Sequence, residues 1–222
     1  MHSSSSAAAR ALKLPPVGLD GDLVVPPATI GVVLFAHGSG SSRHSPRNRL
    51  VARALNARRI ATLLFDLLTE QEAEDRRNVF DVELLGGRLE AAHDFIAAMP
   101  GLGRLPLGYF GASTGAAAAL IAAAHAGGRI AAVVSRGGRP DLAVAALPRV
   151  TAPTLLIVGA EDRDVIPLNA DALAALRCEK RLVLVPGATH LFEEPGALDE
   201  VVALAGAWFV AHFEAAALQS SD

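Results

Sequence analysis

Apolar residues along the chain gather in short continuous runs that alternate with stretches of helical periodicity. A run without a polar residue, such as residues 31–36, is typical of a strand that is buried on both faces. Runs of this kind predict strands at residues 31–36, 60–65, 107–110, 130–134, 155–158 and 182–185. Strands that alternate with helices form a mostly parallel sheet with helices on both faces, so we expect an α/β fold.

The segments between these strands carry the apolar periodicity of helices. Ser45 and Pro46 give one helix a start signal, because a serine hydroxyl caps free backbone N–H groups and proline suits the first turn. Leu85, Leu89 and Ile96 recur at helical spacing in another. The remaining helices are predicted at residues 115–124, 141–146, 169–176 and 198–209.

Two short apolar runs, residues 12–14 and 23–25, precede the first buried strand and flank Leu19-Asp20-Gly21. A turn at that tripeptide predicts an antiparallel hairpin on the edge of the sheet. Residues 1–10 lack the basic region and the long apolar core of a signal peptide, so we expect a disordered leader or a cloning remnant. The acidic run at residues 70–75 is expected to be a solvated loop.

The length of 222 residues suits one domain, which we place at residues 11–222. Hydrophobic residues make up 51% of the chain, enough for a large core. Residues 105–128 contain no Asp, Glu, Lys or Arg, which is long enough to suggest a membrane span. Glycines, a proline and hydroxyl residues interrupt that stretch, so a buried strand, a tight turn and a buried helix explain it better.

The formal net charge is −3, and nucleic acids and anionic membranes both need a basic face. We therefore expect neither as a partner. The single cysteine, Cys178, excludes an internal disulfide and a multi-cysteine metal site. It also fits the reducing conditions of the cytoplasm, which is the expected location.

The five residues Gly111-Ala112-Ser113-Thr114-Gly115 match the pattern G-x-S-x-G. They directly follow a predicted strand and directly open a predicted helix, which is where a nucleophile elbow must lie. Side chains at positions 111 and 115 would crowd such a strained turn. The pattern therefore predicts Ser113 as a nucleophile; the alternative is an ordinary Gly-Ser turn at a helix cap.

A serine hydroxyl needs a base within hydrogen-bond reach, and in this arrangement the acid and then the histidine follow the serine along the chain. Asp162 and His190 each lie in the loop after a predicted strand, at the edge where open α/β sheets bind ligands. We expect Asp162 to orient His190, which takes the Ser113 proton. Glu161 and Asp164 remain alternatives for the acid.

An acyl-transfer site also needs donors for the oxyanion of the tetrahedral intermediate. One expected donor is the backbone N–H of Thr114, directly after the nucleophile. The other is the backbone N–H of Ser39, in the glycine-containing loop 37–40 after the first buried strand. His37 is expected to orient this loop rather than to transfer protons.

Three further residues are expected in loops on the same side of the sheet: Arg43, His44 and Arg136. An arginine facing the pocket would bind a carboxylate or phosphate of the substrate in a bidentate manner. The alternative is that these side chains are solvated, or pair with acids such as Asp66 to brace the loops. Residues 135–153 leave too little chain for a lid domain, so we expect a preference for short acyl groups.

Together these motifs resemble the α/β-hydrolase superfamily, and within it the dienelactone hydrolase-like proteins. Residues 38–48 and 135–140 look like a bacterial subgroup found beside or fused to phosphoribosyltransferase domains. The resemblance implies hydrolysis of carboxylic esters or lactones without a metal or organic cofactor, and a functional link to such a domain. True dienelactone hydrolases use a cysteine nucleophile, so Ser113 argues against dienelactone itself as the substrate.

Two alternatives to an esterase remain open at this stage. The same triad would serve a cofactor-free perhydrolase or an acyltransferase, because the shape of the loops decides which acceptor reaches the acyl-enzyme. A non-catalytic binding module would keep the fold and lose a member of the triad. All three members, Ser113, Asp162 and His190, are present.

Overall fold

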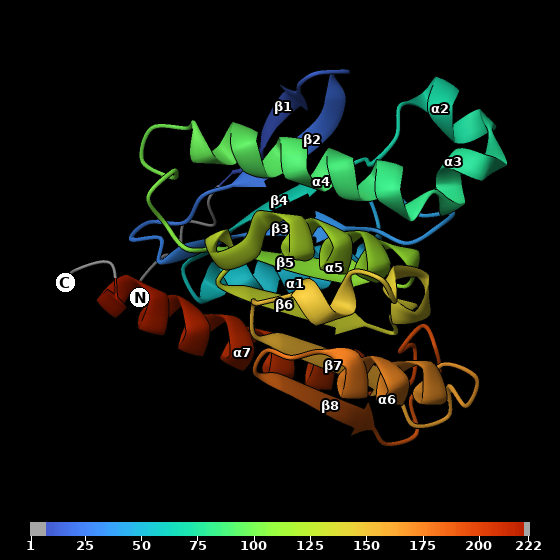
Figure 1. The fold of residues 1–222 in the computed structure, drawn as a ribbon. Coiled ribbons are helices and arrows are strands. Elements are labelled where there is room, and N and C mark those ends of the chain that lie inside the picture. Colours follow the sequence, from blue (N-terminus) through green and yellow to red (C-terminus); the bar gives the residue numbers. More distant parts are fainter. Residues whose placement is uncertain (1–7, 220–222) are drawn as a thin grey trace.

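The computed structural model describes residues 8–219, and Figure 1 shows one twisted sheet between two layers of helices. The eight strands are ordered β1-β2-β4-β3-β5-β6-β7-β8. All pairs from β4 to β8 are parallel, whereas β1 and β2 join the edge antiparallel. The strands are β1 (Arg10–Leu14), β2 (Leu19–Val24), β3 (Gly31–Ala36), β4 (Ile60–Phe65), β5 (Leu107–Ala112), β6 (Ala132–Arg136), β7 (Thr154–Gly159) and β8 (Lys180–Val185). This arrangement is the predicted α/β-hydrolase fold.

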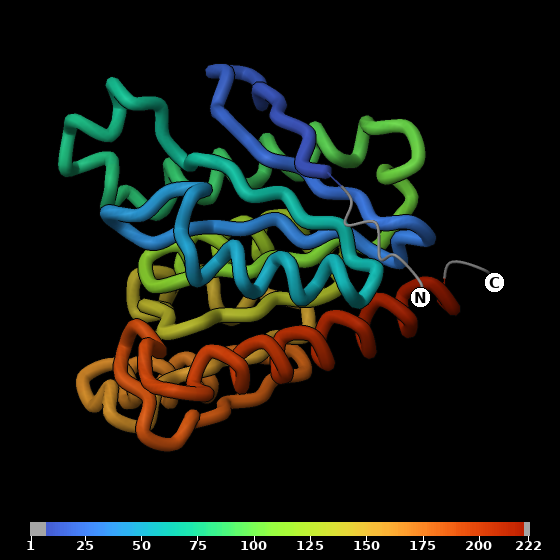
Figure 2. The backbone as a smooth tube through the Cα atoms, turned by 180° about the vertical axis from the view of Figure 1, so that it is seen from behind, coloured from blue at the N-terminus to red at the C-terminus, as the bar shows by residue number. Residues whose placement is uncertain are grey.

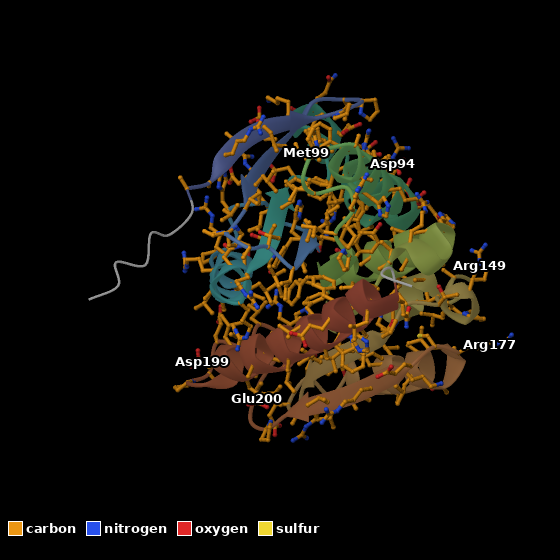
Figure 3. All side chains as sticks on the ribbon, turned by 90° about the vertical axis from the view of Figure 1, so that its left-hand side faces the viewer. Asp94, Met99, Arg149, Arg177, Asp199 and Glu200 are labelled. Carbon is orange, nitrogen blue, oxygen red and sulfur yellow. The ribbon has the colours of Figure 1, made fainter. Side chains whose placement is uncertain are left out.

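Two layers of helices cover the sheet (Figures 1 and 2). One face carries α4 (Val82–Ala97), α5 (Thr114–Ala126) and α6 (Ile166–Ala175), and the other carries α1 (Pro46–Ala57) and α7 (Ala197–Gln219). Each layer encloses its own core, because alternate side chains of a strand point to opposite faces of the sheet. Exposed charges such as Asp94, Arg149 and Asp199 lie on the outside (Figure 3).

The predicted strand at residues 130–134 is shifted by two residues, since β6 begins at Ala132 and ends at Arg136. The pairs Gly111↔Ser135 and Ala112↔Arg136 extend the ladder beyond the apolar run. Ser135 and Arg136 are polar but buried, so the end of the apolar run was not the end of the strand. The shift matters because Arg136 closes a strand instead of lying in a loop.

The antiparallel edge hairpin is confirmed, but its turn was placed wrongly. The closing pair of the ladder is Leu14↔Leu19, so the turn consists of residues 15–18. Gly18 has a φ of +76°, a conformation that suits glycine. Leu19 and Gly21 are instead buried residues of β2, where they face the core.

The acidic run at residues 70–75 is helical and not a loop, because it contains α2 (Glu70–Glu74), which α3 (Arg76–Phe80) follows. A capping box starts α2: the Thr69 hydroxyl accepts from the Glu72 N–H, and the Glu72 carboxylate accepts from the Thr69 N–H. Glu72 also forms a 2.5 Å ion pair with Arg88 of α4. The sequence contains the capping-box pattern, Thr69 followed by Glu72, but the run of acidic residues suggested a solvated loop.

The helix predicted at residues 141–146 is not an α-helix. The 3₁₀ helix η2 (Pro140–Ala143) and a turn occupy this segment, and a second 3₁₀ helix, η3 (Leu147–Arg149), follows it. Prolines 140 and 148 lack the N–H group that a longer helix requires inside it. The expected leader at residues 1–10 falls mostly outside the described residues, and β1 begins at Arg10.

The uncharged stretch at residues 105–128 forms β5 and the buried helix α5, as the sequence predicted. Within residues 8–219, the one helix long and apolar enough to cross a membrane is α7. It packs against β6, β7, β8 and α1 through Val201, Ala205, Phe209 and Phe213. We therefore interpret α7 as a core helix.

Candidate active site

A strained backbone lies at the junction of β5 and α5. Ser113 is the single residue that separates the end of β5 (Ala112) from the start of α5 (Thr114), and it has φ 52° and ψ −122°. This left-handed region is unfavourable for a residue with a Cβ atom. Hydrogen bonds hold the turn in place: the Ser113 N–H donates to the Arg136 carbonyl (3.2 Å), and the Ser113 carbonyl accepts from the Arg139 N–H (3.1 Å).

The two glycines of the elbow are required by close approach. A Cβ atom on Gly111 would lie 2.4 Å from the Cα of Ala116, and one on Gly115 would lie 2.2 Å from the Ala36 carbonyl oxygen. Both distances are far below van der Waals contact, so only glycine fits at either position. The sequence pattern predicted this crowding.

The candidate acid and base are hydrogen-bonded to each other. Asp162 Oδ2 lies 2.7 Å from His190 Nδ1, and the aspartate side chain is only 11% exposed. A carboxylate only accepts, so His190 Nδ1 carries the proton and Nε2 of the neutral ring is free to accept one. The rival Glu161 is exposed and pairs with Arg163, and Asp164 is also exposed. The structure therefore brings Asp162 to His190.

The His190 loop lies over the strand that neighbours the elbow. Gly137 directly follows β6 with φ +53°, and a Cβ atom there would lie 3.2 Å from the His190 carbonyl oxygen and 3.6 Å from its Cε1. The carbonyl oxygen of the preceding residue, Arg136, accepts a hydrogen bond from the Ser113 N–H. Ser113, Asp162 and His190 follow β5, β7 and β8 respectively, at the carboxyl edge of the sheet. Among residues 8–219 the structure shows the Asp162–His190 hydrogen bond and none between Ser113 and His190.

The loop after β3 is fixed by the ring of His37. His37 Nε2 accepts from the Leu67 N–H (3.1 Å), so Nδ1 carries the proton and donates to the Gly38 carbonyl (3.0 Å). Burial lowers the pKa of His37, which favours this neutral ring. Gly38 is held against the elbow, where a Cβ atom would be 3.0 Å from that of Ser113.

The two N–H groups predicted as oxyanion donors lie close together, but one of them is occupied. The Ser39 N–H donates to the side-chain Oγ1 of Thr114 at 2.9 Å. Thr114 is 4% exposed and is the first residue of α5. Sequence reasoning assigned a role to its backbone and overlooked its hydroxyl; the hydroxyl residue beside the nucleophile was the available signal.

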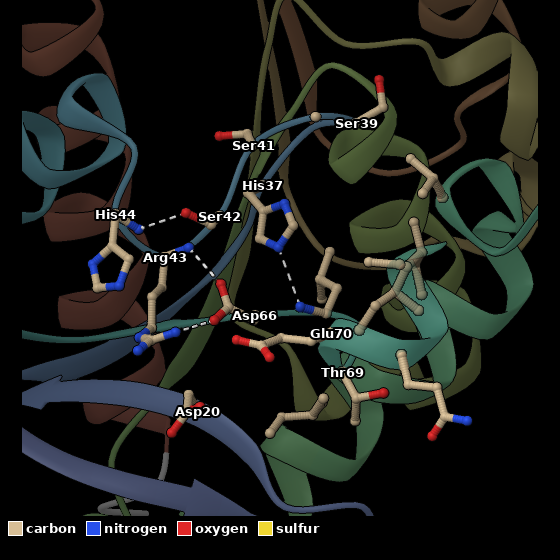
Figure 4. A pocket seen from close by; sticks show the side chains of 18 of the residues that line it. Asp20, His37, Ser39, Ser41, Ser42, Arg43, His44, Asp66, Thr69 and Glu70 are labelled. Carbon is tan, nitrogen blue, oxygen red and sulfur yellow. Dashed lines mark hydrogen bonds and ion pairs between the residues drawn. The ribbon is translucent and has the colours of Figure 1, made fainter. Parts of the chain in front are cut away.

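A cavity of about 1040 Å³ opens beside the same loop. Figure 4 shows its walls, which come from the β1–β2 turn, residues 37–44 and the segment that follows β4. Arg43 and His44 line it, whereas Ser113, Asp162 and His190 do not. The Arg43 guanidinium pairs with Asp66, and its backbone N–H donates to the same carboxylate at 2.8 Å. Arg43 therefore braces the loop, which was the alternative role considered for it.

Arg136 does not line this cavity. Arg136 is 7% exposed, and its side chain packs on the α1 side of the sheet, where Nη2 donates to Asn48 Oδ1 (3.3 Å). The guanidinium lies 5.8 Å from the ring centroid of Phe192, and Nε has no partner among the described residues. Burial, together with the nearby charge of Arg47, lowers the pKa of Arg136 to about 10.

The fold and the elbow define an α/β hydrolase, a class in which a sharp turn after a central strand exposes the nucleophile. Residues 51–217 match the dienelactone hydrolase family, and the chain belongs to that family. Among residues 8–219 there is no group of three or more His, Cys, Asp or Glu side chains positioned to hold a metal ion.

Comparison with known proteins supports the family. A dienelactone hydrolase from Anabaena variabilis is 54% identical, with a TM-score of 0.89 over 93% of this chain and 97% of that chain. Est1E from Butyrivibrio proteoclasticus shares the fold alone, at 15% identity and a TM-score of 0.79. Two Mycobacterium tuberculosis proteins provisionally named phosphoribosyl transferases are 57% identical over 197 residues. The matched region covers 89% of this chain and 44% of the length of each M. tuberculosis protein.

Proposed function

We propose that the chain hydrolyses small carboxylic esters or lactones through an acyl-enzyme on Ser113. The observation that carries this proposal is the 2.7 Å hydrogen bond between Asp162 and His190, at the same sheet edge as the strained Ser113. A carboxylate that fixes the proton on Nδ1 leaves Nε2 as a base. The family and its hydrolase neighbours support the reaction class.

In the first half-reaction, Ser113 Oγ attacks the carbonyl carbon and His190 Nε2 takes the hydroxyl proton. The new C–O bond gives a tetrahedral oxyanion, and the negative charge of Asp162 stabilises the imidazolium ring. Collapse of this intermediate breaks the bond to the leaving oxygen, to which His190 returns the proton. The products are the acyl-enzyme and an alcohol, which stays tethered if the substrate is a lactone.

In the second half-reaction, water replaces the alcohol. His190 takes a proton from the water as the water oxygen attacks the acyl carbon. Collapse of the second tetrahedral intermediate breaks the bond between that carbon and Ser113 Oγ, and His190 returns the proton to Oγ, which gives the carboxylic acid and free Ser113. The oxyanion forms next to the N-terminus of α5, where the Thr114 N–H and the helix dipole favour negative charge.

We further propose that the substrate is short and polar. The cavity beside the oxyanion loop carries charged pairs on its wall, Lys13–Asp20 and Arg43–Asp66, which do not suit a long acyl chain. The connection from β6 to β7 holds two 3₁₀ turns and no lid. Because this chain spans 44% of the M. tuberculosis relatives, we propose that their transferase name refers to the part beyond it.

The test is hydrolysis of p-nitrophenyl acetate, together with labelling by a fluorophosphonate that reacts with activated serines. Ser113→Ala is expected to lose both while its urea unfolding transition remains cooperative. Thr151→Ala, which changes an exposed hydroxyl residue outside the cavity, is expected to retain the label. Labelling or hydrolysis that persists in Ser113→Ala would refute Ser113 as the nucleophile.

A further inference from the structure

We infer that the Thr114 hydroxyl donates a hydrogen bond to the reaction's oxyanion, in the role first expected of the Ser39 N–H. This inference rests on the proposed function. Its starting point is the 2.9 Å hydrogen bond in which the Ser39 N–H donates to Thr114 Oγ1. A backbone N–H has one proton, and this one is directed at the threonine oxygen.

The hydroxyl of Thr114 retains a proton of its own to donate. A hydroxyl accepts through its lone pairs and donates once, and no acceptor for the Thr114 proton is found among residues 8–219. Thr114 is 4% exposed, so its hydroxyl has little contact with bulk water before a substrate binds. A substrate oxyanion bound at Ser113 would supply it.

The hydroxyl and the backbone N–H of Thr114 belong to one residue at the start of α5, directly after the nucleophile. The inference requires the hydroxyl, like the N–H, to point at the reacting carbonyl. In this arrangement the hydrogen bonds run in series, from the Ser39 N–H to Oγ1 and from the hydroxyl proton to the oxyanion. Bonds in such a chain polarise one another, so the Ser39 N–H strengthens the hydroxyl as a donor.

The surrounding structure holds this chain of hydrogen bonds in place. His37 fixes the carbonyl of Gly38 and thereby the peptide that carries the Ser39 N–H. Threonine is branched at Cβ, which restricts its χ1 rotation on a helix. A donor that is oriented before the reaction avoids reorganisation in the transition state.

The experiment compares Thr114→Val, which removes the hydroxyl at nearly constant volume, with Thr114→Ser, which keeps it. The kcat and KM are measured with p-nitrophenyl acetate and with its thiono analogue, in which sulfur replaces the carbonyl oxygen. Sulfur accepts hydrogen bonds weakly, so an oxyanion donor matters less for the thiono ester. The control Thr151→Val changes an exposed threonine between η3 and β7 and is expected to match wild type.

For Thr114→Val we expect kcat on the oxygen ester to fall about 100-fold with KM nearly unchanged, as for other lost oxyanion donors. The thiono ester should lose far less, so the ratio of the two rates collapses, and Thr114→Ser should restore it. The fluorophosphonate labelling rate gives a second readout, because the phosphonyl oxygen occupies the same position. That rate should fall in Thr114→Val alone.

Two results would overturn the inference. A rise in kcat for Thr114→Val would mean that the hydroxyl blocks a Ser39 N–H that acts directly. An equal fall for both esters would mean that the hydroxyl only braces the loop. Hydrolysis that survives Ser113→Ala would instead refute the proposed function itself, so the two failures are distinguishable.

Discussion

Replacing Ser113 by glycine and by alanine separates the cost of the elbow backbone from the loss of the nucleophile. Both variants remove the hydroxyl, which caps no N–H group of α5, so the two differ only in the Cβ atom. That atom is what makes φ 52° unfavourable, because glycine adopts positive φ freely. We therefore expect Ser113→Gly to be the more stable of two equally inactive proteins.

The size of the difference follows from two opposing effects. A non-glycine residue in a sparsely populated backbone region costs about 1–3 kcal/mol. Glycine loses more conformational freedom on folding than alanine, which costs about 0.5–1 kcal/mol. The balance favours Ser113→Gly by about 1 kcal/mol of unfolding free energy, or ~2–4 °C in Tm for a domain of this size.

Urea denaturation of both variants, with equal m-values, measures this difference directly. Ala203→Gly is the control, since Ala203 is an exposed residue in the middle of α7. Glycine at an ordinary helical position should lower the stability by about 1 kcal/mol, the opposite sign. If Ser113→Gly is no more stable than Ser113→Ala while the control behaves as expected, the elbow stores no strain and the argument fails.

Four further expectations follow from the site. Asp162→Asn should lower kcat by about 10⁴-fold, whereas Asp164→Asn should stay near wild type; equal losses in steady-state assays would contradict the assignment of the acid. Cys178→Ser should keep full esterase activity, because its thiol lies beside Thr154, away from the elbow, and inactivation would point to a thiol mechanism. Butanoyl esters should exceed dodecanoyl esters in kcat/KM, and the reverse order would mean that the charged cavity does not hold the acyl group. Burial lowers the pKa of His37 from 6.5, so below about pH 6.5 the unfolded chain binds a proton that the folded chain does not, and stability falls with acidification. Urea unfolding at pH 7.5 and 5 should therefore show a smaller loss for His37→Gln than for wild type, and equal losses would assign the effect to other groups.

The sheet was predictable because its strands are buried on both faces and therefore read as continuous apolar runs. The bounds of β3 and β4 agree with the predicted residues 31–36 and 60–65. The elbow was equally readable, because crowding at Gly111 and Gly115 excludes every other residue. In such segments a single local constraint, burial on both faces or crowding at a turn, determines which residues fit, so the structure can be inferred from the sequence.

The pairing of the acid and the base could be narrowed from the sequence but not decided. Glu161, Asp162 and Asp164 all follow β7 within a few residues, and each has a carboxylate of suitable reach. The choice depends on the backbone of the loop, in which the Asp162 N–H bonds the Gly159 carbonyl and turns the side chain inward. Spacing along the chain does not report that turn.

Arg136 shows why a charged residue at the end of an apolar run is easily misplaced. The sequence pattern puts it in a solvated loop, but the β5–β6 ladder draws it into the sheet and buries it. Burying a guanidinium costs several kcal/mol, and Asn48 and the face of Phe192 offset only part of that cost. Its backbone holds Ser113 while its side chain packs on Phe192, two residues beyond His190. Arg136 therefore contributes to the site by positioning the Ser113 turn and the segment after His190. Composition and periodicity do not reveal a contribution of this kind.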